Sequence, residues 1–325
     1  MDSFNGKADT LHIATYSGWY RFEQRNGQWT QVDRALTFWK MTSLQVDPND
    51  PLHVYLATEH SGLFVTDNGG TEWKRAHPNV PRLTTTSLLA LPGTILAGTV
   101  PAALYSASNG SAWQELEGVR LGATGGSFPP SPELGARTRF LAADDETPRR
   151  LYAAIEVGGM LVSDDAGRRW APAVTGLDDP DVHQILPSLK TKGLVVAACG
   201  EGIYRSADRG EHWEKVTPPG TRTFGSAVAE DGSGAIYVGI ALGRPNTWVR
   251  KERANAALFV SRDGGVRWDI ALEGLRGGIR AMCPASGGQG VFASTSEGDV
   301  LSIDSSGSRT IVSGLPSITA IALGA

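Results

Sequence analysis

The chain has 325 residues, including 40 glycines and 18 prolines, and its 30 basic and 34 acidic residues give a formal charge of -4 at pH 7. No block of like charge stands out, which disfavours a nucleic-acid-binding protein that works by neutralising phosphates. No stretch approaches the ~18 apolar residues of a membrane span, and the N-terminal segment lacks the basic and apolar regions of a secretion signal. We therefore expect a soluble, cytoplasmic protein.

Short strand-like segments follow one another from the N-terminus onward, separated by turns rich in glycine and proline. The first unit has three of them, LHIATY, GWYRFEQ and GQWTQV, and the second has four, SLQVDP, VYLAT, GLFVTD and TEWKRA. The fifth unit repeats that order as QILPSL, LVVAAC, GIYRSA and EHWEKV. Seven such units can be counted, and the last runs on into SITAIALGA at the end of the chain.

One short motif recurs between the third and fourth strands of these units: Ser or Thr, then Asp two residues on, Gly at plus four and Trp at plus seven. It is complete at Ser163-Asp165-Gly167-Trp170, Ser206-Asp208-Gly210-Trp213 and Ser261-Asp263-Gly265-Trp268. It recurs with one substitution at Thr66-Asn68-Gly70-Trp73 and Ser106-Ser108-Gly110-Trp113. A four-stranded antiparallel unit that repeats every ~40 residues or a little more is typical of a propeller blade.

The sequence therefore predicts an all-β fold, a single seven-bladed β-propeller with four-stranded antiparallel blades. Because the first unit is one strand short, we expect residues Ser317 to Leu323 to supply its innermost strand and close the ring, which leaves no open sheet edge. The predicted single domain covers residues 1–325, with blades at approximately 10–34 plus 317–323, 41–77, 84–118, 138–176, 182–217, 223–273 and 279–314.

The recurring motif has a structural interpretation. Ser and Asp oxygens can accept hydrogen bonds from turn amides, Gly tolerates positive φ, and nothing supplies the convergent ligands of a cation site. The SxDxGxxW motifs resemble the Asp-box, or BNR, repeat over nearly all of the chain. This resemblance implies a propeller related to sialidases, two-domain xyloglucanases, sortilin-type receptors and a photosystem II assembly factor, with the motif lying away from the active face. Such a fold does not specify one function.

Alternation of strand direction divides the loops between the two edges of the ring. The motif turns mark one edge, which we call the bottom, whereas second-to-third-strand links and blade-to-blade links emerge on the other, the top. Two long insertions fall on the top, Arg120 to Ala136 and Ala241 to Ala257. The second insertion carries Arg244, Trp248, Arg250, Lys251 and Arg253. Long loops on a rigid scaffold often carry function.

The top loops place charged and aromatic residues around the predicted channel mouth. The candidate ligand-binding residues are Trp39, Glu59, His60, Arg82, Arg139, His183, Arg222, Trp248, Arg280 and Glu297. Lys40, Tyr16, Trp19 and Phe128 add to this set. Carboxylates, guanidinium groups and flat rings suit a glycan, a polar small molecule or a protein segment. We expect no cofactor and no metal, because the histidines are scattered and Cys199 and Cys283 have no metal-ligand spacing and are interpreted as buried free thiols.

Two hypotheses about function remain open at this point. The first is a binding module that presents its top face and channel mouth to a ligand. The second is a glycoside hydrolase or other carbohydrate-active enzyme, for which Glu156 and Glu201 on adjacent blades are the first carboxylates to test. Such enzymes hold two carboxyl groups ~5–5.5 Å apart for retention or ~6.5–9.5 Å apart for inversion. A sialidase is disfavoured, because the sequence has seven units rather than six and no Arg-Ile-Pro segment near its start. The sequence does not predict the oligomeric state.

Overall fold

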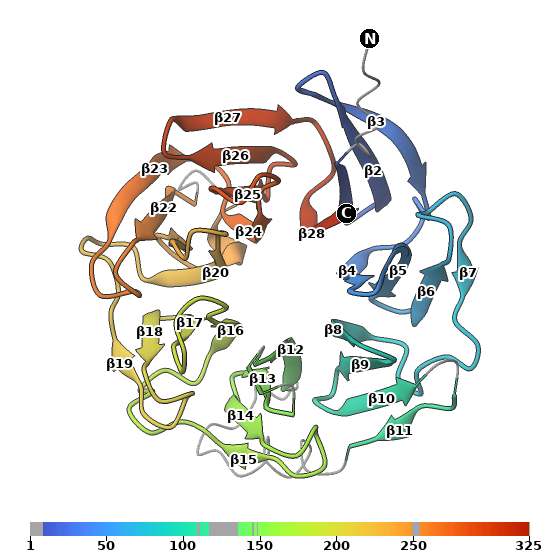
Figure 1. Ribbon diagram of the computed structural model, residues 1–325, viewed down its shortest axis with the longest axis horizontal. Helices are drawn as coiled ribbons and strands as arrows, with labels where there is room; N and C mark the ends of the chain where they lie inside the picture. The colour runs from blue at the N-terminus through green and yellow to red at the C-terminus, as the bar shows by residue number, and fades with distance from the viewer. Residues whose placement is uncertain are drawn as a thin grey trace.

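Seven four-stranded antiparallel sheets stand around a central axis in the computed structural model of the chain (Figure 1). The structure describes residues 9–108, 111–116, 136–144, 146–147, 149–248 and 254–324. The seven sheets confirm the predicted seven-bladed propeller. The innermost strands, from the first blade to the seventh, are β28 (Ile318–Gly324), β4 (Met41–Asp47), β8 (Thr85–Leu91), β12 (Arg137–Ala143), β16 (Val182–Pro187), β20 (Phe224–Glu230) and β24 (Ile279–Pro284).

The middle strands of each blade are packed between neighbouring blades, and their sequences are accordingly rich in Val, Ile, Leu and Ala. The second strands are β1 (Thr10–Thr15), β5 (Asp50–Thr58), β9 (Thr94–Thr99), β13 (Leu151–Glu156), β17 (Val195–Cys199), β21 (Ile236–Ala241) and β25 (Val291–Thr295). The third strands are β2 (Gly18–Arg25), β6 (Leu63–Thr66), β10 (Leu104–Ser108), β14 (Gly159–Ser163), β18 (Gly202–Ser206), β22 (Ala256–Ser261) and β26 (Val300–Asp304). All five residues of β17 are buried, as are all six of β21.

The outer strands face solvent and several are only two residues long, which limits the exposed sheet edge. They are β3 (Gln28–Ala35), β7 (Lys74–Arg75), β11 (Gln114–Glu115), β15 (Ala171–Pro172), β19 (Glu214–Lys215), β23 (Asp269–Leu275) and β27 (Gly307–Val312). The described part of the chain contains no helix long and apolar enough to cross a membrane.

The C-terminal strand closes the ring, as the sequence predicts. Strand β28 pairs antiparallel with β1, with Ile321 opposite Ile13 and Leu323 opposite Leu11. Ile318 and Ile321 pack in one apolar cluster with Phe292 of the seventh blade. The two ends of the chain thus seal the gap between the first and the seventh blade through both hydrogen bonds and apolar contact.

The Asp-box motifs use their polar atoms within their own turns. In the fifth blade, Ser206 Oγ accepts a hydrogen bond from the Gly210 amide at 2.7 Å and donates one to Asp208 Oδ1 at 2.7 Å. Asp208 Oδ1 also accepts from the His212 amide at 2.9 Å. Trp213 Nε1 donates to the Gly210 carbonyl at 3.1 Å, which holds the indole against its blade.

The other motifs repeat this arrangement. Ser163 and Ser261 each accept from the Gly amide four residues on, at 2.8 Å. Thr66 and Asn68 of the second blade form the same contacts although Asn replaces Asp, since the amide oxygen is also an acceptor. Gly110 of the third-blade motif lies outside the described residues.

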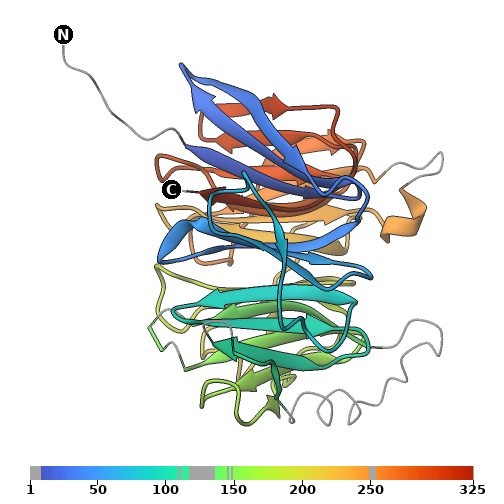
Figure 2. The ribbon, with the colours of Figure 1, turned by 90° about the vertical axis from the view of Figure 1, so that its right-hand side faces the viewer.

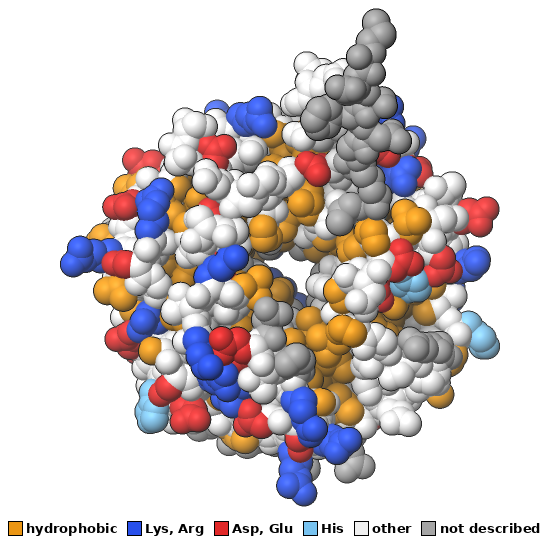
Figure 3. All heavy atoms as spheres, in the orientation of Figure 1, with side chains coloured by type: hydrophobic (Ala, Val, Ile, Leu, Met, Phe, Trp, Pro, Cys, Tyr) orange, Lys and Arg blue, Asp and Glu red, His pale blue; other side chains and the backbone are white. Residues whose placement is uncertain are grey.

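The two edges of the ring differ in what they carry. Figure 2 places the end of the C-terminal strand β28 on one side of the disc and the short 3₁₀ helix η1 (Pro245–Thr247) on the opposite side. The first of these sides is the bottom, and Figure 3 shows it with a hollow at the centre, hydrophobic side chains around the hollow and charged side chains mainly toward the rim. The top, where η1 lies, carries the site described below.

The closing strand leads to a first prediction. Ile321 is 7% exposed, and Ile321→Ala removes packing at the junction between the first and seventh blades. We expect the free energy of unfolding to fall by about 2–5 kcal/mol, as measured by urea denaturation followed through tryptophan fluorescence. The matched control is Val32→Ala on outer strand β3, where the side chain is 37% exposed. Equal losses in both variants would contradict a special contribution of the closing strand.

The Asp-box turns lead to a prediction about pH. Burial acts to raise the pKa of Asp208, but hydrogen bonds from the His212 amide and Ser206 Oγ outweigh it and lower the pKa to about 2. An unfolded Asp titrates near ~3.9, so the carboxylate stabilises the fold above pH ~4 and this contribution is lost as the pH falls through about 2.

Asp208→Asn keeps an acceptor but cannot titrate, as at Asn68 in the second blade. We expect its melting temperature to lie below that of the wild type at pH 7, and the difference to vanish as the pH approaches 2. Calorimetric melting across this pH range measures it. A difference that is constant with pH would show that the ionised carboxylate is not what stabilises the turn.

Candidate ligand-binding pocket at the channel mouth

Each inner strand carries a β-bulge near its start, where the register with the second strand skips one residue. A bulged residue is left out of the regular ladder, and its side chain is re-aimed. In order around the ring, the seven bulged residues are Thr319, Thr42, Thr86, Arg139, His183, Ser226 and Arg280. All seven are polar, so the bulges gather polar side chains at one level of the channel.

Five of these side chains are bound to the channel wall. Thr42 Oγ1 and Thr86 Oγ1 donate to Thr85 O at 2.5 Å and Thr138 O at 2.7 Å. His183 Nδ1 forms a hydrogen bond with Gly225 O, at 2.6 Å. Ser226 Oγ donates to Gly239 O and Thr319 Oγ1 donates to Ala14 O, each at 3.1 Å. Arg139 and Arg280 form no hydrogen bond to the wall within the described ranges. Their guanidinium groups therefore keep hydrogen-bonding capacity that the wall does not use.

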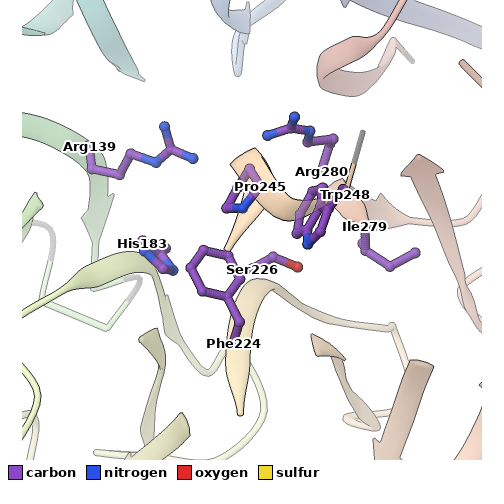
Figure 4. A pocket seen from close by; sticks show the side chains of 8 residues that line it. All are labelled: Arg139, His183, Phe224, Ser226, Pro245, Trp248, Ile279 and Arg280. Atoms are coloured by element: carbon purple, nitrogen blue, oxygen red, sulfur yellow. The ribbon is translucent and has the colours of Figure 1, made fainter. Parts of the chain in front are cut away.

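A pocket opens on this arginine-bearing half of the ring. It is lined by Arg139, His183, Phe224, Ser226, Pro245, Trp248, Ile279 and Arg280, and its empty space of about 230 Å³ includes open solvent. Figure 4 shows the guanidinium groups of Arg139 and Arg280 pointing toward one another from β12 and β24, with Pro245 between them in this view. The pocket thus combines an apolar floor with two cations and a hydroxyl group.

Trp248 acts as a support beneath Arg280. Its indole is only 6% exposed, and its Nε1 donates to the Gly243 carbonyl at 2.7 Å. The Arg280 guanidinium carbon lies 4.9 Å from the ring centroid, in a cation–π contact. Gly278 lies against the ring so closely that a Cβ there would come within 2.2 Å of it. The indole is therefore fixed from several sides and holds the arginine in place.

An ion-pair cluster flanks the pocket on the fourth blade. Arg137 binds Glu156 in a bidentate manner, with both N–O distances at 2.5 Å, whereas Arg139 Nε lies 3.6 Å from Glu156 Oε2. Burial acts to raise the pKa of Glu156, but the hydrogen bond from Arg137 and the charges of Arg139 and Arg137 outweigh it and hold that pKa below its usual value. Glu156 is thus an ionised partner of two arginines.

An acidic corner on the fifth blade was not among the candidates that the sequence suggested. Asp179 accepts hydrogen bonds from the Asp181 and Glu201 amides, and Asp181 Oδ1 lies 3.4 Å from His183 Nε2. Burial and the neighbouring Asp181 carboxylate raise the pKa of Asp179. Burial acts to raise the pKa of Asp181 as well, but the nearby His183 imidazole and two arginines lower it overall. The run DDPDVH directly before an inner strand is the signal that could have pointed to this corner.

The remaining sequence candidates do not join the pocket. Arg222 braces the Asn255 carbonyl at 2.6 Å, and Glu59 pairs with Lys40 at 2.8 Å. Trp39 packs on Phe64, with ring centroids 5.2 Å apart. The exposed candidates on other top loops are His60, Arg82, Glu201 and Glu297. Trp19, expected near the mouth, is fully buried instead.

Several expectations fall on parts of the chain that the structure leaves undescribed. These are most of the insertion from Arg120 to Ala136, with Phe128, and the residues Arg250, Lys251 and Arg253 of the other insertion. Of the twelve ligand-binding and catalytic candidates, the structure brings Arg139, His183, Trp248 and Arg280 together in one pocket.

A possible metal-ligand group lies on the opposite edge of the ring. Within the described ranges, Asp208, Glu211 and His212 could approach one ion, but all three are exposed. Asp208 already accepts hydrogen bonds from Ser206 and His212 within the Asp-box turn. This group therefore has an explanation in the turn itself.

Comparison with known proteins shows that other proteins share the propeller fold of this chain. No protein-family model matches it. A probable oligoxyloglucan-reducing end-specific xyloglucanase of Neosartorya fischeri is 28% identical over 144 residues, which are 42% of this chain and 17% of that protein. The solved GH74 xyloglucanase of Xanthomonas campestris has a TM-score of 0.68 at 18% identity and covers 97% of this chain and 52% of its own. YCF48 bound to D1 peptide has a TM-score of 0.57 at 14% identity, covering 96% of this chain and 87% of its own.

At these identities the likeness is one of fold. The chain spans about half the length of the xyloglucanase structure and 17% of the curated relative. It is a seven-bladed propeller that carries Asp-box motifs, and the names of these relatives point to different functions.

The support under Arg280 leads to a prediction. Gly278→Ala places a methyl group within 2.2 Å of the Trp248 ring, so the indole must move. We expect acrylamide to quench a larger fraction of the tryptophan fluorescence than in the wild type, while far-ultraviolet circular dichroism stays unchanged. The control is Gly243→Ala in the same insertion, whose new Cβ would meet only Thr247 Oγ1, at 3.3 Å. Unchanged quenching in Gly278→Ala would contradict the tight seating of Trp248.

Proposed function

We propose that this protein is a carbohydrate-binding propeller that receives one terminal group of a glycan in the pocket at the channel mouth. The observation that carries the proposal is the pocket itself, where two arginines unattached to the wall face one another above an apolar floor, beside Ser226 and His183. Few, convergent polar groups on an apolar surface are typical of small-ligand sites. The xyloglucanases that share the fold support a carbohydrate as the ligand.

The small, open shape of the pocket favours the end of a chain over its middle. Its space of about 230 Å³ includes open solvent, so little of it is enclosed. A substituent of a terminal sugar would enter between the walls, and the rest of the glycan would extend over the top edge. On the other half of the channel mouth, the bulges of the inner strands carry the hydroxyl groups of Thr42, Thr86 and Thr319.

Binding without hydrolysis is the version of this function that the charges support. The hydrolase hypothesis assigns acid and base roles to Glu156 and Glu201, and a general acid needs a raised pKa. Arg137 and Arg139 instead lower the pKa of Glu156, and Arg137 occupies both of its oxygens. Glu201 is exposed, and its amide is engaged by Asp179.

A glycan array that records retention and product release together tests the proposal. Ser226→Phe should fill the pocket and weaken retention at least ~tenfold, about 1.4 kcal/mol, without product release in either protein. The control is Thr310→Phe, which adds the same ring on the exposed outer strand β27. Retention that is unchanged in Ser226→Phe would remove the pocket from the binding site. Product release that disappears in Glu156→Gln would instead establish the hydrolase.

A further inference from the structure

We propose that the group held in the pocket is a carboxylate, so that the ligand is a glycan ending in a uronic acid, clamped between Arg139 and Arg280. This inference rests on the proposed carbohydrate-binding function and specifies the charge of its ligand. Its basis is the balance of charge around the two guanidinium groups.

Arg280 has a cation–π contact but no acidic partner. In the described ranges it forms no ion pair, and its Nε is buried without a hydrogen-bond acceptor. A buried donor that has lost water and gained no acceptor is unfavourable. Burial lowers the pKa of Arg280; the nearby Tyr16 hydroxyl acts to raise it and the Arg139 charge to lower it, so the pKa stays below its usual value.

Arg139 is only partly compensated. Its nearest carboxylate oxygen is Glu156 Oε2, at 3.6 Å, and that carboxylate already has a bidentate bond to Arg137. Although 38% of the Arg139 side chain is open to solvent, the burial of its guanidinium lowers the pKa, and Glu156 offsets this in part. Asp181 is within electrostatic range but faces His183.

The count of charges favours an anion with a single charge. The four arginines around the pocket, Arg137, Arg139, Arg244 and Arg280, stand against the three carboxylates of Glu156, Asp179 and Asp181, which leaves one positive charge without a partner. One carboxylate balances it, whereas a phosphate with nearly two negative charges would also be repelled by Glu156 and Asp181. A planar carboxylate moreover matches the fork of a guanidinium group in a bidentate contact.

The rest of the pocket suits the sugar ring that bears this carboxylate. Ser226 Oγ donates its hydrogen to Gly239 O at 3.1 Å, so its free lone pair can accept from a sugar hydroxyl. Phe224, Pro245 and Ile279 give the pocket an apolar side against which C–H groups can pack. The acidic group and the ring thus meet different walls of one pocket.

The experiment uses oligosaccharides that end in glucuronate, galacturonate or mannuronate, each compared with its carboxyl-reduced neutral partner. Binding to the full chain is measured by titration calorimetry at low and high salt. We expect at least one uronate to bind at least ~tenfold more tightly than its reduced partner, and this preference to shrink at high salt because charges are screened.

Variants assign the preference to the clamp. Arg280→Gln and Arg139→Gln should each remove most of it, and Arg280→Lys should restore only part, because lysine keeps the charge without the fork. The control is Arg309→Gln, which makes the same change of charge on the exposed outer strand of the same blade. Melting temperatures of all variants verify that they fold.

The outcomes separate this inference from the proposed function. Equal affinity for a uronate and its reduced partner, with Ser226→Phe still disruptive, would overturn the carboxylate but leave a glycan site. Tighter binding of sugar phosphates than of uronates would overturn it in favour of a phosphate. If no glycan binds and a peptide with a free C-terminal carboxylate does, the carbohydrate proposal fails together with this one.

Discussion

The β-bulge near the start of every inner strand is the constraint on which the channel mouth depends. In a regular strand, side chains alternate between two faces, and in a propeller both faces lie against neighbouring blades. The bulge releases one residue per blade from this alternation. Because the neighbouring residues Met41, Val182 and Ile279 remain in the core, the bulged residue can be Thr, His, Ser or Arg without disturbing the packing. Seven equivalent positions therefore determine the chemistry of the mouth.

The two edges of the ring use polar atoms in opposite ways. At the bottom, Ser206, Asp208 and Gly210 satisfy one another within a few residues, and the other Asp-boxes repeat this. A carboxylate that already accepts such bonds has little left to offer a ligand. At the top, Arg139 and Arg280 project from the wall and no neighbouring acceptor satisfies them fully. The polar groups of the bottom edge therefore stabilise its turns, whereas the two arginines of the top edge remain available to a ligand.

This difference explains what the sequence could predict. The Asp-box is a local pattern, so its period revealed the seven blades, and the missing strand of the first unit revealed the closure by β28. The site depends on register between strands, which has no local signal. Arg139 and Arg280 stand on bulges, whereas Arg222 precedes its strand and braces Asn255, yet all three look alike in the sequence. The sequence also suggested Trp248 as a contact for the ligand; in the structure its indole lines the pocket, is largely buried and lies against the Arg280 guanidinium.

The position of Arg280 is unfavourable for the folded state unless its charge serves the ligand that we propose. An arginine with a buried, unpaired Nε weakens the folded state, and a leucine or methionine at the same bulge would avoid that loss. The sixth-blade insertion nevertheless supplies Trp248, and Gly278 leaves room for its ring, so that the guanidinium is held in one place. A group held before its ligand arrives loses little conformational entropy on binding. The unpaired Nε of Arg280 thus lowers the stability of the fold, while the contact with Trp248 holds the guanidinium, before a ligand binds, in a position that faces Arg139.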